Sequence, residues 1–167
     1  MINVHTRPLT SADLSAMRTL LFAEGPNQWN YLTDESVDDQ MALIREGKAT
    51  AVIVEDTRIL GFAVLIFGAQ SPARLAKYAN LAEVAYINDV VVSRELVGKG
   101  YGTRLLEEAV AVAAREAFKA VYIERHEENL ASAGMMRKAG FALVETFYDP
   151  DKRFTGSRNT TVMVKHL

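Results

Sequence analysis

Apolar side chains recur at helical spacing in four stretches of the chain. The first stretch follows Thr10, which opens a capping-box pattern, and the second begins near Glu35 and ends at Gly47. The third, residues 103–118, carries the broadest apolar stripe. The fourth, residues 130–139, precedes a glycine suited to the turn that ends a helix. Four amphipathic helices are therefore predicted.

Runs rich in β-branched residues lie between these stretches and predict strands. They read INVHTRPLT, TAVIVEDTRILGFAVLIFG (a hairpin), AEVAYINDVVV, AVYIER, FALVETFY and NTTVMVKH. Residues 73–79, after Pro72, are expected to form a short helical turn. The resulting order, β-α-α-β-β-β-α-β-α-β-β, predicts an α/β (α+β) fold. Its central sheet is mixed and mostly antiparallel, with helices on both faces.

Composition narrows the class of protein. With 167 residues, 49% of them hydrophobic, the chain suits one domain spanning residues 1–167. The absence of cysteine excludes disulfides and thiolate metal sites, and no metal is expected. A net charge of −2 argues against nucleic-acid binding. No apolar run approaches the ~20 residues that span a membrane, and no signal-peptide layout is seen, so a cytoplasmic protein is expected.

Three glycines, Gly98, Gly100 and Gly102, stand between a run of valines and the third helical stretch. The first turn of a helix presents unpaired N–H groups, and side-chain-free residues let a phosphate approach them. The alternative is that the glycines only form a turn. The spacing G-x-G-x-G matches neither the P-loop nor the dinucleotide fingerprint, so an anion site is indicated without the anion being identified.

Two segments together resemble the GNAT superfamily of acyl-CoA-dependent N-acyltransferases. VGKGYG (Val97–Gly102) resembles the family signature Arg/Gln-x-x-Gly-x-Gly/Ala, and NLASAGMMRKAGF (Asn129–Phe141) resembles its second element. The resemblance extends over residues 3–166 and is strongest over residues 86–141. It implies a GNAT-like fold with a splayed pair of central strands and acetyl-CoA as co-substrate.

The resemblance also implies a set of cofactor-binding residues. The backbone of Val90, Val91 and Val92 would pair with the pantetheine arm. The pyrophosphate would bind the amides of Gly98, Lys99, Gly100, Tyr101, Gly102 and Thr103. Asn129 would contact the cofactor near its thiol, although it also suits a helix N-cap. Val97 departs from the family's Arg or Gln, which leaves the phosphate contacts to Lys99 and the amides.

The family's general-acid tyrosine is replaced by Met136, whose thioether cannot donate a proton. Tyr148, Tyr86 or water would then protonate the leaving thiolate, or the thiolate would leave to solvent unaided, since a free thiol has a pKa of ~8.5.

The candidate bases are carboxylates near the ends of the two central strands. Glu124 and Asp89 occupy positions where family members carry acidic residues, and each also suits a surface ion pair. His126, beside two glutamates, is interpreted as a loop residue.

The acceptor is predicted to be a primary amine of a small molecule or peptide. The resemblance places the segment between the first two helices at the acceptor site, and this segment contains Trp29 and Tyr31. Nearby acidic residues favour a cation: Glu24, Asp34, Glu35, Asp38 and Asp39. A solvated helix face with core aromatics is the alternative.

Two functions follow. The first is acetyl-CoA-dependent N-acetyl transfer by direct attack in a ternary complex, without nucleic acid or membrane partners. The second is an acyl-CoA-binding sensor or interaction module with little or no turnover, which Met136 and Val97 favour. The last two strands are expected to offer an edge for a possible homodimer.

Overall fold

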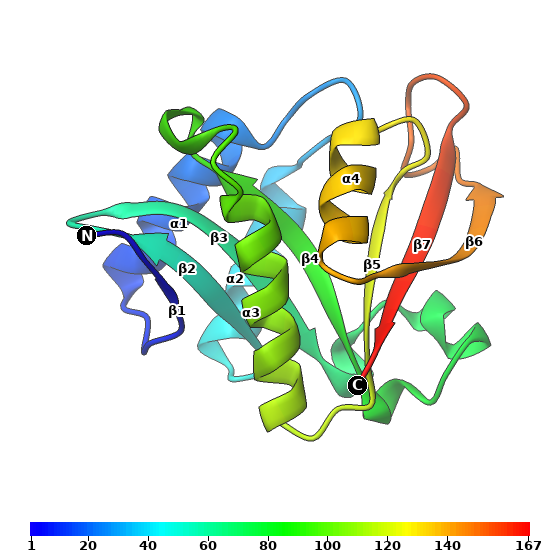
Figure 1. The fold of residues 1–167 in the computed structure, drawn as a ribbon, viewed down its shortest axis with the longest axis horizontal. Helices are drawn as coiled ribbons and strands as arrows, with labels where there is room; N and C mark the ends of the chain where they lie inside the picture. The colour runs from blue at the N-terminus through cyan, green and yellow to red at the C-terminus, as the bar shows by residue number, and fades with distance from the viewer.

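A seven-stranded mixed sheet in strand order β1-β2-β3-β4-β5-β7-β6 forms the centre of the computed structural model, which describes all 167 residues (Figure 1). The strands are β1 (Asn3–His5), β2 (Ala49–Glu55), β3 (Ile59–Phe67), β4 (Val84–Val92), β5 (Ala120–His126), β6 (Ala142–Tyr148) and β7 (Asn159–His166). All neighbours are antiparallel except β4 and β5, which are parallel. The predicted fold class and element order are confirmed.

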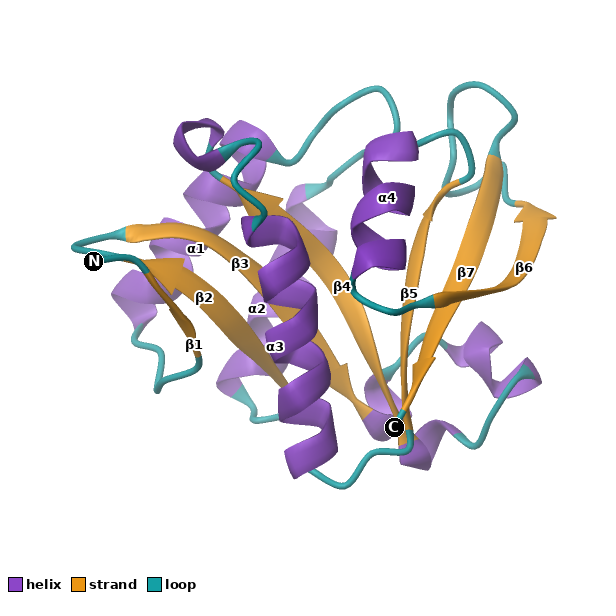
Figure 2. Cartoon of the chain, viewed as in Figure 1, coloured by secondary structure: helices purple, strands orange, loops and turns teal.

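Helices cover both faces of the sheet, as Figure 2 shows. They are α1 (Ser11–Glu24), α2 (Asp34–Arg45), α3 (Tyr101–Arg115) and α4 (Leu130–Lys138). Buried residues of α1 and α2 pack on one face, and those of α3 and α4 on the other, giving two separate apolar cores. No helix of the protein combines the length and the apolar character needed to cross a membrane.

Local sequence signals explain where these helices begin and end. Thr10 and Thr33 each cap a helix by accepting a backbone N–H three residues on. α3 starts two residues before its predicted beginning because Gly100 adopts a left-handed φ of +80° as the N-cap. The helix also ends before residue 118, since Ala117 has a φ of +64°. The predicted helical turn after Pro72 is a 3₁₀ segment, Ala73–Lys77.

The parallel pair β4 and β5 separates partway along its length. Pairing runs from Val84 to Ile87 on β4, and beyond this point the two strands diverge towards the top of Figure 1. A β-bulge lies at the point of divergence, because Asn88 and Asp89 together stand opposite the single residue Val64 of β3. The expected splayed pair is therefore present, and the bulge places two polar side chains at its apex.

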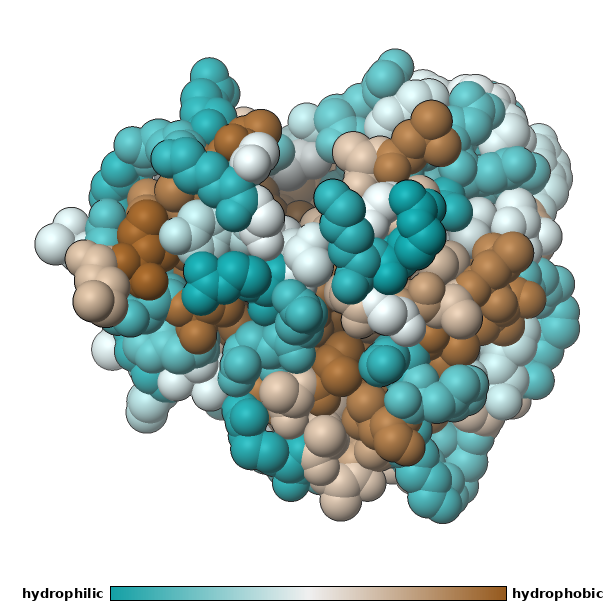
Figure 3. Space-filling model, in the orientation of Figure 1, coloured by the Kyte–Doolittle hydropathy of each residue, from teal (hydrophilic) through white to brown (hydrophobic).

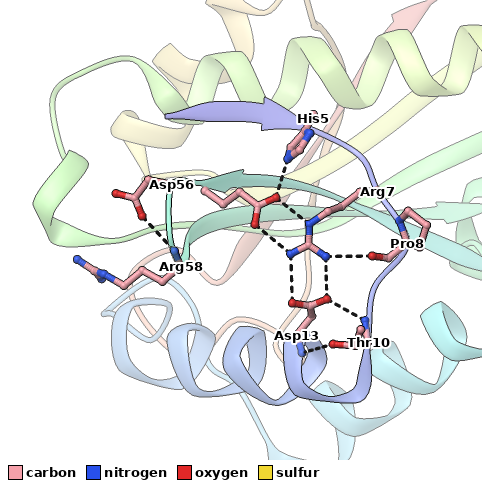
Figure 4. A network of polar contacts seen from close by, with 8 residues as sticks. His5, Arg7, Pro8, Thr10, Asp13, Asp56 and Arg58 are labelled. Atoms are coloured by element: carbon pink, nitrogen blue, oxygen red, sulfur yellow. Dashed lines mark hydrogen bonds and ion pairs between the residues drawn. The ribbon is translucent and has the colours of Figure 1, made fainter. Parts of the chain in front are cut away.

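An ion-pair cluster joins β1, β2 and α1 at the other end of the sheet. Arg7 lies between Asp13 and Glu55 and donates hydrogen bonds to both carboxylates (Figure 4). His5 Nε2 lies 2.6 Å from Glu55 Oε2, the oxygen that also accepts from Arg7 Nε. Asp13 also accepts the backbone N–H of Thr10, so the cluster ties the helix cap to the sheet.

The two closing strands occupy different places in the sheet. β6 is an edge strand and exposes Leu143 and Tyr148, whereas β7 lies between β5 and β6. Only β6 therefore offers the free edge that was expected of both strands. The homodimer stays a prediction.

Candidate active site

A cleft opens where β4 and β5 diverge, and Figure 3 shows the surface hollowed between the loop that precedes α3 and helix α4. Its walls come from the end of β4, the end of β5, the start of α4 and the segment after α1. Val90, Val91 and Val92 all line it. This cleft is called the first cleft below.

The edge of β4 that faces the first cleft has no strand partner. Val90, Val91 and Val92 pair with Ala63, Phe62 and Gly61 of β3, but β5 has turned away on their other side. Backbone groups left unpaired along an edge accept an extended ligand as an added strand. The geometry thus suits the pantetheine arm that the sequence resemblance assigned to these valines.

The loop entering α3 holds several free amide donors. Gly98 and Gly100 have φ values of +79° and +80°, and nothing lies within 4 Å of where their Cβ atoms would stand. Within the protein, the amide groups of Gly98, Gly100, Tyr101, Gly102 and Thr103 make no hydrogen bond outside the helix ladder, whose first bond here runs from Arg104 to Gly100. Lys99 differs, because its amide donates to the Leu96 carbonyl at 3.3 Å. Five of the six predicted amides are therefore free to bind an anion.

Gly102 serves a different purpose from the other two glycines. A Cβ at this position would stand 2.6 Å from the sulfur of Met135 on α4. Close approach of α3 and α4 therefore requires a residue without a side chain here. The absence of a side chain also leaves the N-terminal turn of α3 accessible.

Helix α4 forms one wall of the first cleft. Asn129 is its N-cap, accepts the Ser132 N–H at 3.2 Å, and also lines the cleft, so both of its proposed roles are geometrically compatible. Met136 is buried and lines the cleft as well. Its thioether thus stands at the wall where a tyrosine was expected from the resemblance.

A second cleft adjoins the first on the side of the loop between β6 and β7. It is lined by Asn30, Tyr31, Leu32, Thr33, Ser36, Tyr86, Asn88, Asp89, Glu124, Asp151, Lys152, Arg153 and Phe154. Asp89, Glu124 and Arg153 also line the first cleft, so the two clefts meet at these side chains. A reaction between two ligands, one in each cleft, would take place at this junction.

Glu124 is held by cations at the junction. Its side chain is fully buried, and Oε1 accepts hydrogen bonds from Arg74, from Lys152 at 3.0 Å and from the Tyr86 hydroxyl at 3.1 Å. Burial raises the pKa of Glu124, but the charges of Lys152 and Arg74 outweigh it and hold the pKa below its usual range. The other oxygen, Oε2, is buried without a partner. Glu124 is therefore better suited to bind a cation, as a permanent anion, than to act as a base.

Asp89 has the opposite electrostatics. It lies half-buried in the β4 bulge, and burial raises its pKa above the ordinary aspartate value, against smaller opposing effects of the Gln40 side chain and of the Lys152 charge. A carboxylate with a raised pKa holds a transferred proton more readily. Of the two predicted carboxylates, Asp89 is the better base.

Of the two tyrosines and the histidine, only His126 lines the first cleft. Tyr148 is 64% exposed on β6 and lines neither cleft, so the structure does not bring it to the site. Tyr86 is buried, lines only the second cleft and donates to Glu124. His126 is a buried residue of β5 rather than a loop residue: Nδ1 accepts the Glu128 N–H, and Nε2 then donates to the Thr155 carbonyl. Both of its ring nitrogens are occupied.

The segment after α1 meets the clefts through its aromatic residues rather than its acidic ones. Trp29 lines the first cleft against the His126 ring, and Tyr31 lines the second with Phe154 in edge contact. Among the acidic residues, Asp34 and Asp38 pair with Arg18, and Glu24 pairs with Arg94. Only Glu24 lines a cleft, so the acidic acceptor wall that the sequence suggested is not formed.

Arg74, Lys152 and Arg153 were missed by sequence reasoning. They lie on a 3₁₀ segment and on the β6–β7 loop, far in sequence from any motif. The pair Lys152-Arg153 carried no local signal, because only the sheet order brings that loop beside β5. No group of three or more histidine, aspartate or glutamate side chains in the protein is placed to hold a metal ion.

Comparisons with known proteins agree with this geometry. The model of a family described as "Acetyltransferase (GNAT) family" matches residues 14–141. No curated protein sequence matches the chain.

Several solved structures share the whole fold. An acetyltransferase from Bacillus subtilis in complex with CoA has a TM-score of 0.73 at 15% identity, with 100% of this chain and 99% of that chain covered. A ribosomal-protein-alanine N-acetyltransferase from Brucella melitensis has a TM-score of 0.75 at 21% identity, with 100% and 99% covered. The aminoglycoside acetyltransferase AAC(6')-Ib in complex with coenzyme A has a TM-score of 0.73 at 20% identity, with 98% and 95% covered.

Proposed function

The chain belongs to the acetyltransferase (GNAT) family, and from this premise we propose that it transfers an acetyl group from acetyl-CoA to a primary amine by direct attack. The observation that carries the proposal is the junction of two clefts at Asp89 and Glu124. One cleft has the free strand edge and amide donors that a CoA thioester needs, and the other opens to an acceptor. The cytoplasmic location and the absence of nucleic-acid or membrane partners stay predictions.

The acetyl-CoA donor is bound mainly by backbone groups, because Val97 replaces the Arg or Gln of the family signature. Free amides at the start of α3, assisted by the positive end of the helix dipole, bind the pyrophosphate. The exposed side chain of Val97 contributes no charge, so Lys99 is the cation within this loop. The edge of Val90–Val92 and the amide of Asn129 orient the pantetheine arm.

Proton transfer assigns different roles to the two carboxylates. An alkylammonium with a pKa near ~10 must lose a proton before it attacks. Glu124 stays ionised and binds the ammonium through Oε2, while Asp89 accepts the proton, directly or through water. The amine nitrogen then forms a bond to the acyl carbon and the carbon–sulfur bond breaks. Because Met136 cannot donate and Tyr148 lies outside the clefts, the thiolate takes its proton from solvent.

Thiol release from acetyl-CoA with a panel of amines tests this function. We expect release with at least one amine and none without protein. Binding of CoA by calorimetry without release for any amine would instead support the sensor.

The location of the donor is tested by a pair of glycine variants. Gly100 and Gly47 both have left-handed φ values, +80° and +73°, with open space where a Cβ would lie. Alanine at either position costs about 1–2 kcal/mol of stability because of the strained φ. Only Gly100→Ala places a methyl group at the proposed phosphate site, so we expect its CoA affinity to fall at least tenfold while Gly47→Ala binds normally. Equal affinities would remove the donor from this loop.

A further inference from the structure

The acceptor's chemistry is indicated by a buried arginine that the mechanism above does not use. Arg153 is only 5% exposed and lines both clefts at their junction. Its Nε donates to the Thr160 hydroxyl at 2.8 Å, which is the only side-chain hydrogen bond of Arg153, so neither terminal nitrogen donates to a protein group. Since a guanidinium stays charged at neutral pH, a positive charge faces the clefts.

Two neighbouring carboxylates, Glu124 and Asp149, are already paired with other cations. Glu124 pairs with Arg74 and Lys152, and Asp149 pairs with Arg74 at 3.1 Å. Arg153 makes no ion pair with either of them. Arg153 is therefore the one cation of the three without an ion-pair partner at the junction.

The guanidinium is also held in one orientation. Thr160, which accepts from Nε, is completely buried, and its hydroxyl donates to Asp149 at 2.7 Å. Asp149 is itself bound to Arg74. This chain of hydrogen bonds fixes the planar fork, whose two terminal nitrogens match the two oxygens of a carboxylate.

We propose, building on the proposed function, that the acceptor is an amino acid or a similar small amine whose carboxylate binds Arg153. Asp89 and the free Oε2 of Glu124 lie at the same junction, so one compact ligand can place its amine at these groups and its carboxylate on the arginine. The aromatic side chains of Tyr31 and Phe154 line the second cleft and offer an apolar contact for the rest of the ligand. An unpaired buried charge is costly to folding, and the ligand supplies its missing partner.

Matched acceptors test the role of the carboxylate. Turnover is measured with phenylalanine, phenylalaninamide and phenethylamine, which share the aromatic group and differ at the carboxylate. Two charge-assisted hydrogen bonds predict that kcat/KM for phenylalanine exceeds that of the other two by about tenfold to a hundredfold. Equal values for the three acceptors would overturn the proposal, although acetyl release itself would still support the proposed function.

Substitution of the arginine shows whether it reads the carboxylate. We expect Arg153→Gln to abolish the preference while CoA binding by calorimetry is retained, and Arg153→Lys, which keeps the charge without the fork, to keep part of it. Arg125 lines only the first cleft and donates to backbone carbonyls, so Arg125→Gln is the matched control and should keep the full preference. An unchanged preference in Arg153→Gln would refute the assignment. A variant that changes only the choice of acyl donor, between acetyl-CoA and succinyl-CoA, would also refute it, because Arg153 would then bind the donor rather than the acceptor.

A binding measurement separates this inference from catalysis. Calorimetry of phenylalanine against the CoA-loaded protein should show binding that Arg153→Gln weakens at least tenfold. Absence of any binding, together with normal CoA binding, would overturn the carboxylate site, whereas absence of CoA binding would contradict the proposed function first.

Discussion

Two arginine clusters, one at the β1 edge of the sheet and one at the central clefts between β4 and β5, differ in how completely they are paired. Arg7, which is partly exposed, donates from all three of its nitrogens, to two carboxylates and a carbonyl. Arg153, which is almost fully buried, donates only from Nε. Desolvation penalises the buried charge more, yet the buried arginine has fewer partners.

This difference distinguishes a cluster that stabilises the fold from one that serves a ligand. The carboxylates around Arg7 keep their pKa values below the usual range, because the hydrogen bonds from Arg7 favour their ionised forms. At the clefts, burial raises the pKa of Asp89, and an oxygen of Glu124 stays unpartnered. Residues of the first cluster should therefore affect stability alone, whereas those of the second should affect activity, sometimes at a gain in stability.

The largest expected effect is that of Asp89→Asn on turnover. Loss of the base should lower kcat/KM about a hundredfold to a thousandfold. Burial raises the folded-state pKa of Asp89, so the ionised carboxylate destabilises the folded protein. The protonated form contributes stability at low pH, and this contribution is lost as pH rises through the raised pKa. The variant should thus be more stable than the native protein at pH 7, by an amount that shrinks towards pH 4.

The control for this change is Asp39→Asn on α2, an exposed aspartate without ion-pair partners. Kinetics across pH and urea denaturation provide the two readouts. Near-native turnover by Asp89→Asn would remove Asp89 from the chemistry.

A smaller loss of activity, combined with a loss of stability, is expected for Glu124→Gln. The substitution leaves Arg74 and Lys152 facing a neutral amide inside the protein, which should cost about 3 kcal/mol of stability. The acceptor's KM should rise about tenfold, because the anion that binds its ammonium is gone. Glu145→Gln, which loses contacts to Lys77 and Tyr78 at a more exposed position, is the control and should leave the KM unchanged. An unchanged KM in Glu124→Gln would confine Glu124 to a structural role.

The sequence predicted the parts of the fold and of the site that depend on local pattern. Thr10 and Asp13 predicted the cap of α1, and Gly98, Gly100 and Gly102 predicted an amide loop at the start of α3, whereas the free strand edge at Val90–Val92 was implied by the family resemblance. Each of these signals lies within a few residues of what it specifies. The expected free amide of Lys99 was the exception, because its hydrogen bond to Leu96 depends on the turn between them.

The acceptor side could not be predicted in this way, because it is assembled from distant segments. The acidic residues near Trp29 suggested a cationic ligand. Three of them are paired with arginines, Asp34 and Asp38 with Arg18 and Glu24 with Arg94, and the sequence does not show such pairings. Arg153 reaches the clefts only because β7 inserts between β5 and β6 and carries the preceding loop with it. Tyr148 was misplaced for the same reason: its strand forms the outer edge of the sheet.

The smallest effect on activity, and the clearest one on stability, is expected for Arg7→Met. Loss of its hydrogen bonds to Asp13 and Glu55 should cost about 2 kcal/mol of stability, with kcat/KM unchanged, because Arg7 lines neither cleft. The pKa values of both carboxylates are lowered in the folded state, so their contribution to stability is present above the unfolded values near ~4 and is lost as pH falls below them. Urea denaturation from pH 7 to pH 3 should therefore show a steeper loss for the native protein than for Arg7→Met. Parallel curves would mean that the Arg7 cluster contributes no more to stability than an exposed ion pair, and the contrast between the two arginine clusters would then rest on Arg153 alone.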